Sequence, residues 1–135
     1  MNSTSPACST IPARPQKTIF VVDDNDMVRR TITQILESDG NEVFSSESPQ
    51  RALHQITSWT KAPDLMICDI CMPVISGFDL YRQIEQRFPQ QPVLFITGYP
   101  DGHSAMCHDL LNEHNLLRKP FRVAELLQRV HKLIA

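Results

Sequence analysis

The chain of 135 residues is 41% hydrophobic and 21% charged, and thirteen basic residues against fifteen acidic ones give a formal net charge of -2. This length fits one domain around a single core, and the composition is typical of a soluble globular protein rather than a disordered one. The small net charge excludes an overall positive field, so we expect neither nucleic acid nor an anionic bilayer as a direct partner.

The first residues carry no targeting signal that we can identify. Residues 1–16 are rich in Ser, Thr, Pro and Ala without periodicity, which predicts a flexible tail ahead of one domain over 17–135. They lack the apolar centre of a signal peptide, and no apolar run approaches the roughly 20 residues of a membrane span. We therefore expect a cytoplasmic protein whose four cysteines are reduced thiols.

Five short β-rich segments alternate along the chain with amphipathic segments. Strands are expected at residues 18–22, 42–46, 64–68, 92–96 and 115–119. Three of them read as continuous apolar runs, as in strands that are covered on both faces.

The segments between the strands have apolar residues at helical spacing. The expected stripes contain Val28, Ile32, Ile35 and Leu36; Leu53 and Ile56; Leu80, Ile84 and Phe88; Met106 and Leu110; and Val123, Leu126, Leu127, Val130 and Leu133. Asp26 and Ser48-Pro49 are typical helix starts, and Gly40 is typical of the residue after a helix end. Five strand-helix units predict an α/β fold, a doubly wound open parallel sheet that binds ligands at the carboxyl ends of its strands.

Chemically active residues stand at four of these carboxyl ends. The first strand is followed by Asp23 and Asp24, the third by Asp69, the fourth by Thr97 and the fifth by Lys119. Three carboxylates that meet at one rim raise one another's pKa values unless a cation neutralises them, and Mg²⁺ is the hard divalent ion that suits such a set. An ammonium and a hydroxyl facing the metal are suited to hold the remaining oxygens of a phosphoryl group.

Asp69 is the expected acceptor of that phosphoryl group. It ends a central strand and precedes a Met-Pro turn, which leaves its carboxylate as the nucleophile for an aspartyl phosphate. Taken alone, an Asp-Asp pair after a strand is commonly a loop or helix-cap feature, and Lys119 is commonly a solvated side chain. Asp23, Asp24, Asp69, Thr97 and Lys119 all stand at the carboxyl ends of predicted strands, and this coincidence favours a functional site.

Four ordered segments of the sequence resemble the receiver domain of response regulators in two-component signalling. These are FVVDDNDMVRR (20–30), CDICMPVISGFDL (68–80), FITGYPD (95–101) and LLRKPF (116–121). The match covers residues 17–135. It implies a flavodoxin-like (βα)₅ fold with strand order 2-1-3-4-5, as in the chemotaxis receiver that is a standard example of that order, and Asp69 as the phosphoacceptor.

The resemblance also implies the roles of the other site residues. Asp24 would be a direct Mg²⁺ ligand, Asp23 a ligand acting mainly through water, and the main-chain carbonyl of Cys71 a further ligand. Thr97 and Lys119 would contact the phosphoryl group. The Lys119-Pro120 peptide bond is expected to be cis, which an X-Pro bond adopts at modest cost.

Receivers take their phosphoryl group from the phosphohistidine of a histidine kinase or a histidine phosphotransfer protein. They catalyse their own phosphorylation and often their own dephosphorylation by water, and they signal through the face of the fourth helix, fifth strand and fifth helix, as monomers or phosphorylation-dependent dimers. Because one helix follows Phe121, we expect a stand-alone receiver. The alternatives are a fragment of a larger regulator or hybrid kinase, and a pseudo-receiver that binds partners without phosphotransfer.

The sequence departs from the family at one position and leaves another open. Leu116 stands three residues before Lys119, where the family usually has Tyr or Phe, so the aromatic half of the usual switch is missing. Cys71 and Tyr99 border the expected path of attacking water. A bulky Tyr99 is predicted to shield the acyl phosphate and lengthen its lifetime.

A site built on sulfur is the competing interpretation of the same region. Cys68 and Cys71 have C-x-x-C spacing, and Cys107, His103 and His108 supply further residue types for zinc or a redox pair. There is no second C-x-x-C, however, and Cys68 lies in a predicted buried strand, where cysteine is usually a small core residue. The interpretation built on Asp69 is therefore favoured.

Overall fold

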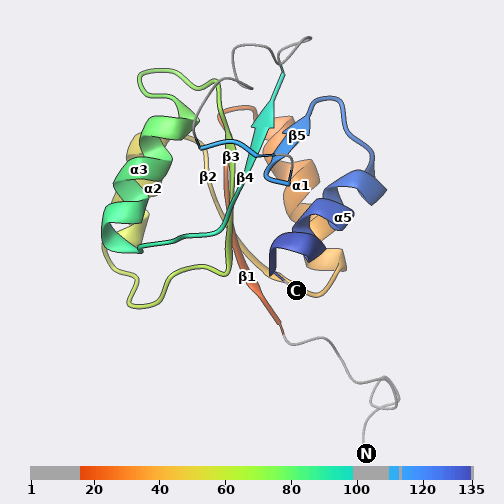
Figure 1. The fold of residues 1–135 in the computed structure, drawn as a ribbon, viewed down its shortest axis with the longest axis horizontal. Coiled ribbons are helices and arrows are strands. Elements are labelled where there is room, and N and C mark those ends of the chain that lie inside the picture. The colour runs from red at the N-terminus through yellow and green to blue at the C-terminus, as the bar shows by residue number, and fades with distance from the viewer. Residues whose placement is uncertain (1–15, 99–109, 113, 135) are drawn as a thin grey trace, which may run out of the picture.

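The computed structural model describes residues 16–98, 110–112 and 114–134. Its strands are β1 (Thr18–Val22), β2 (Glu42–Ser46), β3 (Leu65–Asp69), β4 (Val93–Thr97) and β5 (Leu116–Arg118). All neighbouring strands pair in parallel, in the order β2-β1-β3-β4-β5 (Figure 1). The expected doubly wound sheet and its strand order are thus confirmed.

Among the described residues, two helices cover each face of this sheet. They are α1 (Asp26–Ser38), α2 (Pro49–Ile56), α3 (Gly77–Arg87) and α5 (Val123–Ile134). Figure 1 shows α2 and α3 on one side of the sheet and α1 and α5 on the other. The helix predicted around Met106 and the tail predicted over 1–16 fall outside the described residues, apart from Leu110 and Gln16. Within the described ranges, no helix combines the length and the apolar character that crossing a bilayer requires.

Three strands differ slightly from their predicted bounds. β3 begins and ends one residue later, and just before it the side chain of Asp64 accepts the N–H of Thr18 at 2.8 Å. β4 also begins one residue later, since Pro92 has no N–H to donate to a neighbour. β5 is shorter than predicted at both ends, and the side chain of Asn115 just before it donates to the carbonyl of Leu110 at 2.8 Å.

The sheet separates two hydrophobic cores because successive side chains of a strand point to opposite faces. Phe20, Met66 and Phe95 pack towards α2 and α3 in one core, together with Ala52 and Leu80 from those helices. The second core holds the intervening strand residues with side chains from α1 and α5; its members include Ile19, Val21, Ile67, Leu94, Leu36 and Leu126. Burial on both faces explains why the strands read as continuous apolar runs.

The caps of the helices fix where they start, close to the carboxyl ends of the strands. α1 begins at Asp26, as predicted, and Asn25 caps it by accepting the N–H of Val28 at 3.0 Å. Ser48 caps α2, as predicted. Gly40 follows the end of α1 with a φ of 90°, a left-handed conformation that glycine adopts without a Cβ penalty.

Candidate functional site

Three carboxylates meet where β1 and β3 end. Asp23 and Asp69 are buried and Asp24 is exposed, and one oxygen from each lies within 4.8 Å of the others. The two strands are neighbours in the sheet, and Val22 pairs with Cys68, so the residues that follow them are adjacent. The structure therefore brings together the acidic residues that the sequence placed at this rim.

Lys119 reaches the same cluster from the loop after β5. Its Nζ lies 3.1 Å from Oδ2 of Asp69 and 3.3 Å from Oδ2 of Asp23. Its main-chain N–H donates to the carbonyl of Thr97 at 2.8 Å, and the Lys119-Pro120 bond is cis, as expected. One ammonium thus lies between the two buried carboxylates.

The remaining carboxylate oxygens are held unequally. Oδ1 of Asp23 accepts the N–H of Asn25 at 2.8 Å, and Oδ1 of Asp69 accepts the N–H of Cys71 at 3.1 Å. Oδ2 of Asp23 is buried and has no hydrogen-bond partner among the described residues, although Lys119 lies within ion-pair distance. A buried anionic oxygen with unused lone pairs is costly, and a hard cation with oxygen ligands would satisfy it. The residues present therefore fit Mg²⁺.

Burial and charge shift the pKa values of this cluster. Burial raises the pKa of Asp23, the N–H of Asn25 opposes that rise, and the charge of Asp69 adds to it. For Lys119, burial alone would lower the pKa, but the two carboxylates together outweigh burial and raise the pKa. Lys119 is therefore held in its charged form, while Asp23 gains from any further positive charge nearby.

Thr97 ends β4 on the strand next to Asp69 and is fully buried. Asp69 pairs with Ile96, so Thr97 lies one residue further towards the rim than the partner of Asp69. Thr97 therefore lies at the carboxyl end of β4, where the sequence predicted it. The contact of Thr97 with a phosphoryl group and the metal role of the Cys71 carbonyl stay predictions.

Gly77 shows how closely α3 packs against the segment that carries Asp69. A Cβ atom at Gly77 would lie 2.3 Å from the main-chain oxygen of Asp69 and 3.0 Å from Sγ of Cys68. The N–H of Gly77 also donates to the carbonyl of Ile70 at 2.8 Å. Only a residue without a side chain permits this approach, which explains the glycine eight positions after Asp69.

The cysteines do not form a site of their own within the described residues. Cys68 is fully buried, with Sγ 3.4 Å from the main-chain oxygen of Asp69, whereas Cys71 is exposed. Burial raises the pKa of the Cys68 thiol well above its usual value, and the charges of Asp69 and Asp23 raise it further, which keeps it from acting as a thiolate. In the described ranges, only the three acidic residues Asp23, Asp24 and Asp69 bring potential metal ligands close enough together to hold an ion. The other members of the sulfur alternative, Cys107, His103 and His108, lie outside them.

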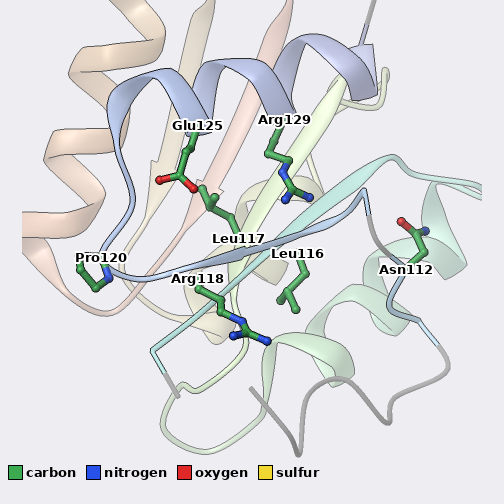
Figure 2. A pocket seen from close by; sticks show the side chains of 7 residues that line it. All are labelled: Asn112, Leu116, Leu117, Arg118, Pro120, Glu125 and Arg129. Atoms are coloured by element: carbon green, nitrogen blue, oxygen red, sulfur yellow. The ribbon is translucent and has the colours of Figure 1, made fainter. Parts of the chain in front are cut away.

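Leu116 lies on β5 and is buried, with 8% of its surface exposed. It lines a cavity of about 370 Å³ between β5 and α5, together with Arg118 of the same strand and Arg129 of α5. Figure 2 shows Leu116 and Arg118 on the same side of β5. Leucine therefore packs at the position where an aromatic residue was expected for the family. Tyr99, the residue predicted to shield the acyl phosphate, lies outside the described residues.

One residue next to the site was not identified from the sequence. Nη1 of Arg29, on the second turn of α1, donates to the main-chain oxygen of Asp23 at 2.8 Å, and Nη2 lies 2.5 Å from Oδ1 of Asp26. Its side chain is 15% exposed. The only available signal was its position one helical turn after Asp26, which does not reveal a contact with a main-chain oxygen.

Comparison with known proteins gives consistent matches. Residues 19–131 match the family model for the response regulator receiver domain. The chain is 32% identical over 116 residues to the DNA-binding transcriptional regulator NtrC of Klebsiella pneumoniae, a match that covers 86% of this chain and 24% of NtrC. It is 31% identical over 117 residues to the transcriptional regulatory protein CssR of Bacillus subtilis, covering 87% of this chain and 51% of CssR. The chain thus spans about a quarter to a half of the length of these relatives.

Solved structures agree with the same assignment. A response regulator receiver domain protein from Clostridium thermocellum superimposes with a TM-score of 0.77 at 31% identity, covering 87% of this chain and 94% of the other. The chemotaxis protein CheY4 of Vibrio cholerae gives a TM-score of 0.76 at 22% identity, covering 87% of this chain and 98% of the other, and so supports the fold alone.

Proposed function

The chain belongs to the response regulator receiver family, and on that premise we propose that residues 17–135 form a receiver that accepts a phosphoryl group on Asp69 with the help of Mg²⁺. One observation carries the proposal. Lys119 lies 3.3 Å from Asp23 and 3.1 Å from Asp69, while Oδ2 of Asp23 still lacks a hydrogen-bond partner among the described residues. The cluster holds more negative charge than its single ammonium neutralises, as suits a site that binds a divalent cation and a phosphoryl group.

Asp69 is the proposed nucleophile. A carboxylate oxygen of Asp69 forms a bond to the phosphorus of a phosphohistidine, the phosphorus–nitrogen bond breaks, and the released imidazole takes up a proton from solvent. The hydrogen bond from the N–H of Cys71 fixes Oδ1, which leaves Oδ2 on the side of Lys119. Hydrolysis by water would later return Asp69 to its free carboxylate, so the receiver would also catalyse its own dephosphorylation.

The other residues would stabilise the charge that develops on the phosphoryl oxygens. Asp23, Asp24 and the carbonyl of Cys71 would hold Mg²⁺, which supplies positive charge at those oxygens when bound. Lys119 contributes a second positive charge, and Thr97 would donate its hydroxyl to another oxygen. The raised pKa of Lys119 keeps its ammonium charged throughout the neutral range.

The rim also carries exposed apolar side chains that fit a protein donor. Met27 near the start of α1, Val74 in the loop after β3 and Val123 at the start of α5 are 78%, 84% and 53% exposed. Each follows a strand end that contributes to the acidic cluster or to Lys119. Exposed apolar groups around a polar site are typical of a partner interface. We propose that a histidine kinase or a histidine phosphotransfer protein docks here.

The proposed output is a change in the face that β5 and α5 present, read by a downstream protein or by a second copy in a phosphorylation-dependent dimer. Leu116 replaces the aromatic switch residue on this face, so the change would involve a smaller side chain beside the cavity of Figure 2. Whether the receiver acts alone is tested by the length of the natural gene, since both curated relatives described above are at least about twice as long as the matched segment.

Incubation with acetyl phosphate and Mg²⁺, followed by intact mass measurement, tests the proposal. The wild-type chain is expected to gain one phosphoryl group, and the gain should disappear when EDTA removes the metal. Asp69→Asn, which keeps the size of the side chain, is the matched control and should gain none. If the wild-type chain gains no mass while a known receiver is labelled in parallel, the chain is a binding module without phosphotransfer.

A further inference from the structure

We propose that Arg29 is a positioning residue for the metal site, acting through the main chain of Asp23 rather than through any contact with metal or substrate. The inference rests on the proposed function, because it assigns a role in binding Mg²⁺. It concerns the β1–α1 loop, residues 23–25, which carries two of the three acidic side chains.

Three separate hydrogen bonds anchor Asp23. Its N–H donates to the carbonyl of Ser46 on β2 at 3.2 Å, and its Oδ1 accepts the N–H of Asn25 at 2.8 Å. Its main-chain oxygen accepts from Nη1 of Arg29 at 2.8 Å. The first bond continues the sheet and the second is local to the loop, so the Arg29 contact is the one of the three that ties Asp23 to α1.

The contact with Arg29 is strong for two reasons. Asp23 is only 1% exposed, so little water is available to replace a lost partner of its carbonyl. The donor is a guanidinium, and hydrogen bonds from charged donors are stronger than neutral ones. Removing Arg29 would therefore leave a buried carbonyl under-satisfied directly before Asp24, and the loop would be free to move its carboxylates away from Asp69.

The two contacts use the two terminal nitrogens of a planar guanidinium, so a positive charge of another shape would not reproduce them. Nη1 binds the carbonyl of Asp23, and Nη2 is held 2.5 Å from Oδ1 of Asp26 in the first turn of the same helix. The carboxylate of Asp26 thus orients the guanidinium towards the loop. Lysine has one ammonium on a flexible stem and cannot keep both contacts with the same fixed geometry.

The adjacent Arg30 provides a matched control. It lies on the same helix and carries the same charge, but its side chain is exposed, and it stands one position further along the chain from Asp23. Replacing either arginine by glutamine removes one positive charge near an acidic cluster. That loss of charge alone would make Mg²⁺ bind more tightly in both variants. If Arg29 positions the loop, Arg29→Gln should instead bind Mg²⁺ more weakly, while Arg30→Gln should not. The direction of the change in affinity therefore distinguishes loss of positioning from loss of charge.

The experiment measures Mg²⁺ affinity by isothermal titration calorimetry for the wild-type chain, Arg29→Gln, Arg30→Gln and Arg29→Lys. Groups that orient metal ligands typically change affinity by about 10-fold to 100-fold when removed, and we expect about 10-fold weaker binding for Arg29→Gln. Arg30→Gln should bind as tightly as wild type or slightly more tightly. Arg29→Lys should fall between wild type and Arg29→Gln, since it keeps the charge and loses the fork.

Labelling by acetyl phosphate gives a second readout. Arg29→Gln should need more Mg²⁺ for half-maximal rate, while its rate at saturating Mg²⁺ stays close to wild type. A loss of rate that saturating Mg²⁺ does not restore would contradict a role in positioning the metal ligands. Urea unfolding of each variant establishes that the proteins compared are folded, and Arg29→Lys carries the test if Arg29→Gln fails to fold.

Two results would overturn different claims. If Arg29→Gln, or Arg29→Lys in its place, binds Mg²⁺ as tightly as Arg30→Gln, the positioning role of Arg29 is wrong while the proposed receiver function stands. If the wild-type chain itself shows no Mg²⁺ binding and no labelling, the proposed function fails before Arg29 is tested.

Discussion

At the amino ends of the strands, buried polar side chains join neighbouring segments through neutral hydrogen bonds, whereas at the carboxyl ends two buried carboxylates face each other across one ammonium. The hydroxyl of Tyr81 donates to the carbonyl of Gln91 at 2.9 Å, and Nε2 of Gln91 donates to the carbonyl of Pro63 at 3.0 Å. These bonds connect α3 and the segment before β4 to the segment before β3. Their effect is to hold the fold together.

The carboxyl rim is arranged differently. Asp23 and Asp69 are both buried and share Lys119, and the charge of Asp69 adds to the effect of burial in raising the pKa of Asp23. A fold gains nothing from placing two carboxylates so close unless a ligand completes the site. Substitutions of polar side chains at the amino ends of the strands should therefore reduce stability and leave phosphorylation intact. Substitutions at the carboxyl ends should abolish phosphorylation and change stability little.

Asp69→Asn gives the largest expected effect on function. Phosphorylation should be lost completely because an amide cannot accept the phosphoryl group. The free energy of unfolding should stay within about 1 kcal/mol of wild type, because the loss of the ion pair with Lys119 is offset by relief of repulsion from Asp23. Urea unfolding measures the second quantity. A loss of more than about 3 kcal/mol would show that the carboxylate serves the fold as well.

Gly77→Ala should give the largest loss of stability at the carboxyl rim. Its Cβ would lie 2.3 Å from the main-chain oxygen of Asp69, so the segment carrying the phosphoacceptor must move. We expect a loss of about 1–3 kcal/mol, as for other overpacked sites, together with slower labelling by acetyl phosphate. Gly98→Ala is the matched control, since no atom of the described residues other than its chain neighbours lies within 4 Å of its added Cβ. Equal stability of the two variants would contradict the close approach of α3.

Tyr81→Phe tests the amino rim. It removes the hydroxyl that lies 2.9 Å from the carbonyl of Gln91 and 3.2 Å from Oε2 of Glu85, and it should cost about 1 kcal/mol in the free energy of unfolding, while labelling with acetyl phosphate stays unchanged. Urea unfolding and intact mass measure the two quantities. A large loss of labelling without a loss of stability would reverse the contrast between the rims.

The same tyrosine predicts a pH dependence. Burial, and then the charge of Glu85, raise the pKa of Tyr81 to about 12 in the folded protein. An unfolded tyrosine titrates near pH ~10, so the unfolded state releases its proton first, and the contribution to stability is complete below that pH and lost as pH rises towards the folded pKa. The stability difference between wild type and Tyr81→Phe should therefore shrink between about pH 10 and pH 12. A constant difference would contradict the raised pKa.

Val74→Gly should give the smallest effect and one of opposite sign. Val74 has a φ of 76°, a left-handed conformation that is unusual for a β-branched residue, and its side chain is exposed. Glycine should relieve this strain and raise the free energy of unfolding by about 1 kcal/mol. Gln90, with a φ of 62°, is unbranched, so Gln90→Gly should gain less. Urea unfolding of both variants decides, and a larger gain at Gln90 would contradict strain at Val74.

Most of the site was predictable from the sequence because parallel strands bring their carboxyl ends to one rim. The positions of Asp23, Asp24, Asp69 and Lys119 follow from that rule once the strands are placed, and small errors at strand ends do not change it. The burial of Cys68 was predictable for a related reason, because its strand reads as a continuous apolar run.

Contacts made through the main chain were not predictable. Arg29 binds the carbonyl of Asp23, an atom that every residue possesses, so no residue type marks the contact. The role of Asn25 as the cap of α1 is of the same kind: the sequence indicated the helix start at Asp26, but the path of the loop decides which side chain before it accepts the N–H of Val28. Val74 likewise shows no sign in the sequence of its left-handed backbone.

The most direct test of the account is the position of the acyl phosphate. After labelling with acetyl phosphate and Mg²⁺, reduction with borohydride converts a phosphorylated aspartate to homoserine, which peptide mass mapping locates. We expect homoserine at position 69, in amounts that follow the phosphoryl gain of the intact chain and vanish with EDTA. Conversion at Asp23 or Asp24 instead, or labelling that is independent of the metal, would contradict it.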